Sequence, residues 1–93
     1  MEVNYSILLS LYYKEKPEYL RISLDSIFNQ TLVSDDVVLV EDGRLGDALE
    51  SVVKGYEVRY PQLHVVRFEK NRGLGFALND GLTYCKHELV ARM

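Results

Sequence analysis

The sequence predicts an α/β fold with a doubly wound, mostly parallel sheet that stops after about four strands. Short apolar runs rich in β-branched residues alternate with segments whose apolar residues recur at helical spacing. The connecting segments are short, and right-handed crossovers are the usual way to join parallel strands. The 93 residues are therefore expected to form one unit, residues 1–93, with the order β-α-β-α-β-α-β.

The first half of the chain contains two expected strands with one helix between them. Residues 5–12 form a short apolar run bounded by polar residues, which is typical of a strand covered on both faces. Pro17 suits the first turn of a helix, and the polar residues 29–31 end it. The apolar residues of this helix recur at helical spacing: Leu20, Leu24, Ile27 and Phe28. Residues 37–40 predict a second buried strand, closed by residues 41–43.

The second half repeats the alternation twice. A second amphipathic helix ends before Pro61, and its apolar residues are Leu49, Val52, Val53 and Tyr56. Residues 63–68 alternate between apolar and polar and predict a third strand, and residues 71–75 form a glycine-rich turn. A third helix is expected to carry one apolar face, made of Leu78, Leu82 and Cys85. Residues 89–91 predict a fourth, buried strand.

Composition excludes several classes of function. The formal net charge is −3 and the pI is about 5.3, so nucleic acid is not an expected partner. The single cysteine, Cys85, cannot form an internal disulfide and suits a small buried position. His64 and His87 lie apart and form no metal-ligand pattern. Glu2 and Asn4 interrupt any leader peptide, and no apolar run approaches the ~20 residues of a membrane span. We therefore expect a cytoplasmic protein.

The candidate ligand site lies where strands end. In open α/β sheets, ligands bind outside the carboxyl ends of the strands, at the point where the strand order reverses. This rule nominates residues 10–15, residues 42–44 and whatever follows Met93. Asp42 is the strongest candidate because a carboxylate at a strand end can accept from a ligand; an Asx-turn or helix cap is the alternative. Ser10 and Tyr12 end the first strand and could contact a base, or simply pack.

Two further features are weaker signals. The loop 71–75 precedes a helix, whose N-terminal N–H groups attract anions, and Arg72 could add a phosphate contact. Glycines also simply turn chains, and Leu78 occupies the third position of a G-x-G-x-x-G pattern. Glu15 could reach a ribose, although a solvated acid at a helix start is the alternative. Close packing of helix on strand is the simplest role for Gly81.

Taken together, these segments resemble the N-terminal half of family 2 glycosyltransferases of the bacterial surface-polysaccharide type. The matching segments are residues 6–13, 26–31, 38–43, 71–73 and 79–81, in order and at family-like spacing. The resemblance implies a GT-A fold, which is Rossmann-like, and a nucleoside-diphosphate sugar as donor, often a UDP-sugar. It also implies transfer with inversion to a saccharide or lipid-linked acceptor in cell-surface polysaccharide synthesis.

The resemblance also assigns roles to residues. Ser10 and Tyr12 would contact the base, Asp42 would accept from the base or ribose, and Asn71 and Arg72 complete the nucleotide-binding set. The family's next motif is an acidic Asp-x-Asp-type cluster, which would bind a divalent metal, Mg²⁺ or Mn²⁺, at the donor's diphosphate. That cluster and the catalytic base would follow the last residues of this chain, so no metal ligand and no catalytic residue is assigned here.

The chain departs from the family pattern at two positions. Leu78 stands where an arginine is common, and Tyr13 stands where an asparagine is frequent. Two other functions were weighed: a non-catalytic interaction domain that keeps the fold, and an NAD-binding domain. The second requires a glycine fingerprint after Tyr12, and residues 13–16 offer none.

The isolated chain is expected to be inactive. We also expect it to self-associate, because a fourth strand without a neighbour leaves an unpaired edge. The longer protein is expected to be cytoplasmic and peripheral at the inner face of the membrane.

Overall fold

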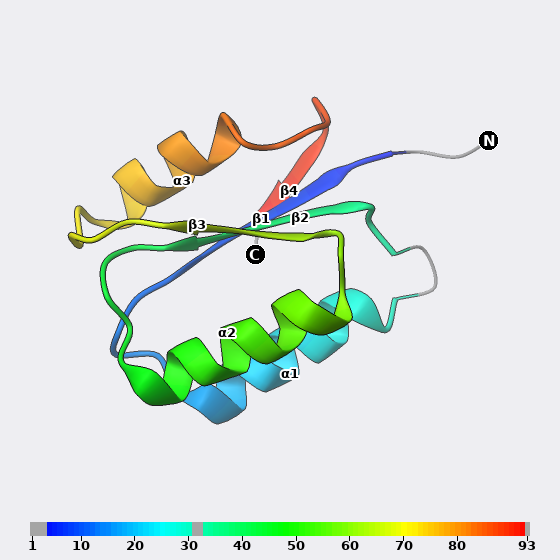
Figure 1. The fold of residues 1–93 in the computed structure, drawn as a ribbon. Coiled ribbons are helices and arrows are strands. Elements are labelled where there is room, and N and C mark those ends of the chain that lie inside the picture. The colour runs from blue at the N-terminus through cyan, green and yellow to red at the C-terminus, as the bar shows by residue number, and fades with distance from the viewer. Residues whose placement is uncertain (1–3, 31–32, 93) are drawn as a thin grey trace.

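The computed structural model describes residues 4–30 and 33–92, and its elements follow the predicted order (Figure 1). In chain order they are β1 (Ser6–Leu11), α1 (Pro17–Phe28), β2 (Asp36–Glu41), α2 (Asp47–Arg59), β3 (Leu63–Arg67), α3 (Leu74–Leu82) and β4 (Val90–Arg92). Three residues that carried expectations from the sequence, Glu2, Thr31 and Met93, lie outside the described ranges.

The four strands form one parallel sheet in the order β3-β2-β1-β4. Helices α1 and α2 cover one face of the sheet, and α3 covers the other (Figure 1). The chain runs from β1 outward through β2 to β3 and then returns to place β4 on the other side of β1. The strand order therefore reverses at β1, which confirms the predicted doubly wound sheet.

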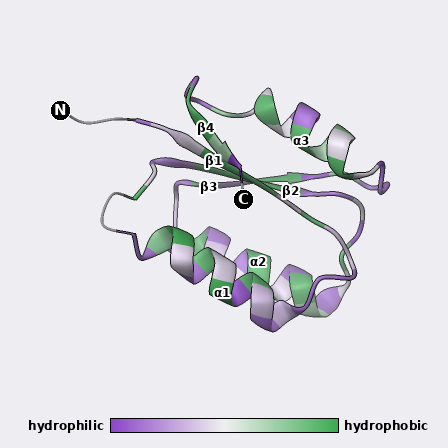
Figure 2. Ribbon diagram, turned by 180° about the vertical axis from the view of Figure 1, so that it is seen from behind, coloured by the Kyte–Doolittle hydropathy of each residue, from purple (hydrophilic) through white to green (hydrophobic). Residues whose placement is uncertain are grey.

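Alternation along the central strands builds two separate cores. Ile7, Leu9 and Leu11 of β1 pack with α1 and α2, whereas Leu8 packs with Ala77 of α3. Successive side chains of a strand point to opposite faces, so a strand covered on both faces must be apolar throughout. Figure 2 shows the central strands as largely hydrophobic, while hydrophilic residues are interspersed along the helices. Burial of the central strands on both faces therefore explains the near-continuous apolar runs in the sequence.

Two expectations about the last elements are corrected. The third helix was expected to continue to Cys85, but α3 ends at Leu82 because the N–H groups of Thr83, Tyr84 and Cys85 bond to carbonyls three residues back and tighten the chain. Cys85 still packs half-buried on the α3-side core, and burial raises its pKa. The fourth strand is not buried: Val90 is half-buried and the rest of β4 is exposed, since β4 pairs only with β1 within residues 4–30 and 33–92.

A buried polar network joins the amino ends of three strands. The Asp36 carboxylate, only 1% exposed, accepts from the Ser6 hydroxyl and from the Lys86 backbone N–H, both at 2.6 Å. The Ser6 Oγ in turn accepts from the His87 backbone N–H at 3.0 Å. A buried carboxylate must be hydrogen-bonded, and here the donors come from β1 and from the segment that leads into β4. The network therefore fixes β4 beside β1.

Gly81 provides a direct test of this packing. A Cβ at Gly81 would lie 2.6 Å from Leu8 Cδ1 and 2.8 Å from Val40 Cγ2, so any larger residue here must displace one of these side chains. We expect Gly81→Ala to lower the free energy of unfolding by about 1 kcal/mol, because overpacking outweighs the better helix propensity of alanine.

Gly55 of α2 is the matched control, because a Cβ there meets nothing within 4 Å. Gly55→Ala should raise the free energy of unfolding by roughly 0.5–1 kcal/mol. Urea titration of both variants measures the two changes. Equal effects of the two substitutions would contradict the packing described for α3.

Candidate functional site

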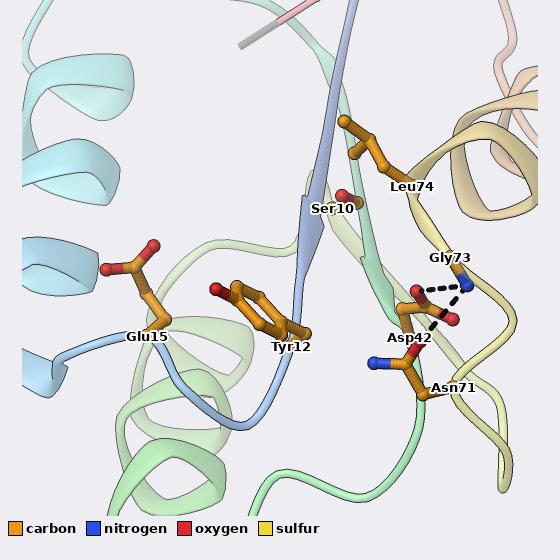
Figure 3. Close-up of a pocket in the computed structure, with 7 residues that line it drawn as sticks. All are labelled: Ser10, Tyr12, Glu15, Asp42, Asn71, Gly73 and Leu74. Atoms are coloured by element: carbon orange, nitrogen blue, oxygen red, sulfur yellow. Dashed lines mark hydrogen bonds between the residues drawn. The ribbon is translucent and has the colours of Figure 1, made fainter.

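A cavity of about 460 Å³ opens at the carboxyl ends of β1 and β2, where the strand order reverses. It is lined by Ser10, Tyr12, Glu15, Asp42, Asn71, Gly73 and Leu74 (Figure 3). The lining comes from the end of β1, the end of β2 and the loop before α3. A cavity of this size and position is typical of a small-molecule site in an open α/β sheet.

Strand alternation determines which side chains reach the cavity. Ser10 and Tyr12 have the same parity as Leu8, whose side chain belongs to the α3-side core. Asp42 has the same parity as Val40, which belongs to the same core. Strands β1 and β2 are parallel and paired in register, so these side chains emerge at one edge and on one face of the sheet. The cavity therefore lies on the α3 side.

The Asp42 carboxylate joins two segments of the site. It is 6% exposed, and its Oδ1 accepts from the Arg72 backbone N–H at 2.9 Å and its Oδ2 from the Gly73 N–H at 3.1 Å. The Gly73 N–H also donates to Asn71 Oδ1 at 3.1 Å (Figure 3). Hydrogen bonds to an ionised carboxylate are stronger than neutral ones. Asp42 thus fixes loop 71–73 against the end of β2.

Gly43 lets this loop approach the end of β2. Its φ is +92°, in the left-handed region, and a Cβ on it would lie 2.8 Å from the Asn71 backbone nitrogen. Any other residue would be strained at this φ and would also collide with main chain, which cannot rotate away. The Asp-Gly pair therefore supplies a carboxylate and a clear space for the loop that the carboxylate binds.

Tyr12 and Glu15 line the other side of the cavity. The Tyr12 side chain is exposed, and its ring meets the Tyr13 ring edge to face, with centroids 6.0 Å apart. The Glu15 N–H donates to the Tyr12 carbonyl at 3.1 Å, which turns the chain toward α1, and the half-buried Glu15 carboxylate accepts from the Lys16 N–H at 3.0 Å. The ring of Tyr12 is therefore available to a ligand, and Glu15 supplies an acceptor beside it.

Arg72 differs from the other candidates because its side chain does not line the cavity. Its guanidinium donates to Asp80 Oδ2 at 2.7 Å and lies 5.0 Å from the Phe68 ring centroid and 5.5 Å from that of Phe76. Only its backbone N–H faces Asp42. Thus Ser10, Tyr12, Asp42 and Asn71 share one cavity, and the Arg72 guanidinium lies outside it.

Two lining residues, Gly73 and Leu74, were not among the predicted site residues. Gly73 belonged to a recognised glycine-rich turn, so its position after β3 was a usable signal. Leu74 is the first residue of α3 and is 63% exposed, and nothing in its residue type indicated a site. Neither position could be assigned to the cavity without knowing where the loop folds back.

Glu41, the neighbour of Asp42, points to the opposite face and is buried beside α2. The Arg67 Nε lies 3.4 Å from its Oε2 and also binds Glu50 at 2.9 Å. Among the described residues this Oε2 has no hydrogen-bond partner of good geometry. Burial, together with the hydrogen-bonded and negatively charged Glu50, raises the pKa of Glu41 to about 8. The folded chain therefore favours the protonated form of Glu41 at neutral pH.

The acidic residues present do not fit a divalent metal. Within residues 4–30 and 33–92, no group of three or more His, Cys, Asp or Glu side chains is placed to hold a metal ion. Among the described residues, the carboxylates that line the cavity are those of Glu15 and Asp42, and Asp42 is engaged by two N–H groups. In the same part of the chain, no helix has the length and apolar character needed to cross a bilayer.

The arrangement defines an α/β ligand-binding unit with its cavity at the reversal of strand order. The sequence model of one family, glycosyl transferase family 2, matches residues 6–93. The chain belongs to this family, and its fold is of the GT-A type.

Two curated relatives are similar over 89 residues, which is 96% of this chain. An amylovoran biosynthesis glycosyltransferase from Erwinia amylovora is 49% identical over that length. The UDP-Gal:alpha-D-GlcNAc-diphosphoundecaprenol beta-1,3-galactosyltransferase from Escherichia coli is 40% identical. The aligned regions are 33% and 32% of these relatives, so the chain spans about a third of their length.

Solved structures agree with the family assignment. A mannosyltransferase from Pyrobaculum calidifontis, in complex with GDP-Man and Mn²⁺, superposes with a TM-score of 0.79 at 25% identity. That match covers 94% of this chain and 26% of the mannosyltransferase chain. TarS from S. aureus superposes with a TM-score of 0.72 at 25% identity, over 98% of this chain and 16% of its own.

The raised pKa of Glu41 makes stability depend on pH. The pKa of Glu41 is raised in the folded state from 4.5 to about 8, so the folded chain binds more protons than the unfolded chain between these values. Stability should therefore fall as pH rises, by an amount on the order of 2 kcal/mol between pH 5 and pH 8. Urea titrations at several pH values measure this fall.

Glu41→Gln should flatten the pH dependence, since glutamine can donate to Glu50 without titrating. Glu69→Gln, which replaces an exposed glutamate shortly after β3, is the control and should keep the wild-type slope. A Glu41→Gln profile as steep as that of the wild type would refute the assignment.

Proposed function

We propose that residues 1–93 are the N-terminal, nucleotide-sugar-binding part of an inverting glycosyltransferase. The longer protein transfers a sugar from a nucleoside-diphosphate donor, a UDP-sugar, to a saccharide or lipid-linked acceptor in cell-surface polysaccharide synthesis. The supporting observation is the convergence of Ser10, Tyr12 and Asp42 on one cavity at the reversal of strand order. Parallel sheets bind nucleotides at this point.

The chemistry of the lining suits a nucleoside. The exposed Tyr12 ring offers a face on which a base can stack. Asp42 accepts one N–H on each carboxylate oxygen, and an ionised carboxylate has about four lone-pair sites, so each oxygen can accept a further donor. A uracil-like ring carries one N–H donor that this carboxylate can accept. Ser10 and Asn71 add polar groups at the same cavity.

The relatives support the donor and acceptor classes. The E. coli relative is named for UDP-Gal and for an acceptor linked to diphosphoundecaprenol, and the mannosyltransferase was solved with GDP-Man and Mn²⁺. A divalent cation, Mg²⁺ or Mn²⁺, belongs to the proposal for the longer protein only, since the acids described here do not fit one. A cytoplasmic location at the inner face of the membrane belongs to the same proposal, because a lipid-linked acceptor is held in a membrane.

The nucleoside proposal predicts a role for Asp42 that calorimetry measures. Asp42→Asn replaces an ionised acceptor and should weaken UDP binding on the order of tenfold. Asp47→Asn, which alters an exposed aspartate at the start of α2 outside the cavity, is the matched control and should bind UDP like the wild type. Equal UDP affinities for Asp42→Asn and the wild type would remove Asp42 from the nucleotide site.

The isolated chain should not transfer sugar. No described residue is assigned to deprotonate the acceptor, and general-base catalysis typically contributes 10²–10⁴-fold to the rate. Incubation of the 93-residue chain with UDP-sugars and lipid-linked acceptors should therefore give no glycosylated product above background. Product that depends on the folded chain would contradict the proposal. Self-association through the free edge of β4 stays a prediction of the same kind.

A further inference from the structure

The side chain of Arg72 points away from the cavity that its backbone helps to form. The guanidinium lies between the rings of Phe68 and Phe76, at 5.0 and 5.5 Å from their centroids, and forms an ion pair of 2.7 Å with Asp80. Both distances to the rings are within the range of cation–π contacts. Three contacts from two segments therefore hold one side chain in place.

These contacts connect the end of β3 to α3 across the loop between them. Phe68 directly follows β3, while Phe76 and Asp80 belong to the first and second turns of α3. The loop itself carries the two N–H groups that bond to Asp42, from Arg72 at 2.9 Å and Gly73 at 3.1 Å. The position of these donors therefore depends on where the Arg72 side chain is anchored.

We propose that Arg72 is a positioning residue for the nucleotide site, and that its side chain does not bind the donor's phosphates. The guanidinium braces loop 71–73 against α3, and the braced loop holds the Asp42 carboxylate at the cavity. This inference rests on the proposed function for its ligand. It replaces the phosphate contact that the sequence suggested for Arg72.

Electrostatics favours the brace over a phosphate contact. To reach a diphosphate, the guanidinium would leave two aromatic rings and break the ion pair with Asp80. The Asp80 carboxylate would then lose its partner while a dianionic ligand bound nearby. A guanidinium can pair with a carboxylate and stack on aromatic faces, and Arg72 makes contacts of both kinds here.

Binding of uridine and of UDP, followed by NMR titration, separates the two roles. A brace acts on the whole site, so Arg72→Ala should weaken uridine and UDP by the same factor, about 5–20-fold. Asp80→Asn, which keeps the shape and removes the charge, should also weaken both ligands. A phosphate contact predicts a different pattern: Arg72→Ala weakens UDP alone, and Asp80→Asn strengthens UDP by freeing the arginine. That second pattern would overturn the inference.

Two matched controls lie far from the cavity, at the end of α2 and just before β2. The Arg59 guanidinium also rests on two rings, 5.3 Å from Tyr56 and 5.1 Å from Tyr60, and Asp35 pairs with Lys86 at 3.0 Å. Arg59→Ala and Asp35→Asn should leave the affinities for uridine and UDP unchanged. Arg72→Lys should restore part of the binding lost in Arg72→Ala, because lysine keeps the charge but not the planar group.

Amide hydrogen exchange tests the brace without any ligand. Asp80→Asn should speed exchange at the Arg72 and Gly73 amides several-fold, and Asp35→Asn should not. Unchanged exchange in Asp80→Asn would overturn the inference even if nucleotide binds. If the wild type binds neither uridine nor UDP, the proposed function fails, and faster exchange in Asp80→Asn would still support the brace.

Discussion

The site depends on the hydrogen bonds between the Asp42 carboxylate and the backbone of loop 71–73. These bonds join segments about thirty residues apart in the chain, the end of β2 and the loop that leads into α3. Gly43 removes the obstacle to this contact, and the bonds supply the attraction. Because the acceptor is a largely buried carboxylate, leaving it without donors would cost more than an ordinary hydrogen bond contributes. The cavity wall is therefore set by the main chain as much as by side chains.

Parallel pairing and strand alternation place the remaining groups. With β1 and β2 in register, residues of equal parity leave the sheet together, and this brings Tyr12 beside Asp42 while sending Glu41 to the opposite face. Two adjacent acids thus meet different surroundings. One accepts N–H donors at the cavity, and the pKa of the other is raised by burial and by Glu50 of α2. Their positions one residue apart in the strand place these two carboxyl groups on opposite faces of the sheet.

The sequence predicted the fold well because its signals are local. Apolar runs, helical spacing and short connections are properties of neighbouring residues, and they gave the element order, the parallel sheet and the strand ends that carry Ser10, Tyr12 and Asp42. What the sequence left open depends on side-chain contacts, on the tight turns that end α3 and on the neighbours of the last strand. The direction of the Arg72 side chain depends on its contacts with Phe68 and Asp80, which residue types alone do not reveal. The burial of β4 depends on neighbours that local periodicity cannot reveal.

The buried polar network at the amino ends of β1, β2 and β4 does not constrain all of its residues in the same way. Ser6 and Asp36 contribute through their side chains, so their identities matter. Lys86 and His87 contribute to it through main-chain N–H groups alone. For this network, either position needs only a backbone donor, which proline lacks. The side chains of Lys86 and His87 instead bind Asp35, at 3.0 and 2.6 Å. The entrance to β4 is thus tied to the sheet by main chain on one side of the contact and by two specific side chains, Ser6 and Asp36, on the other.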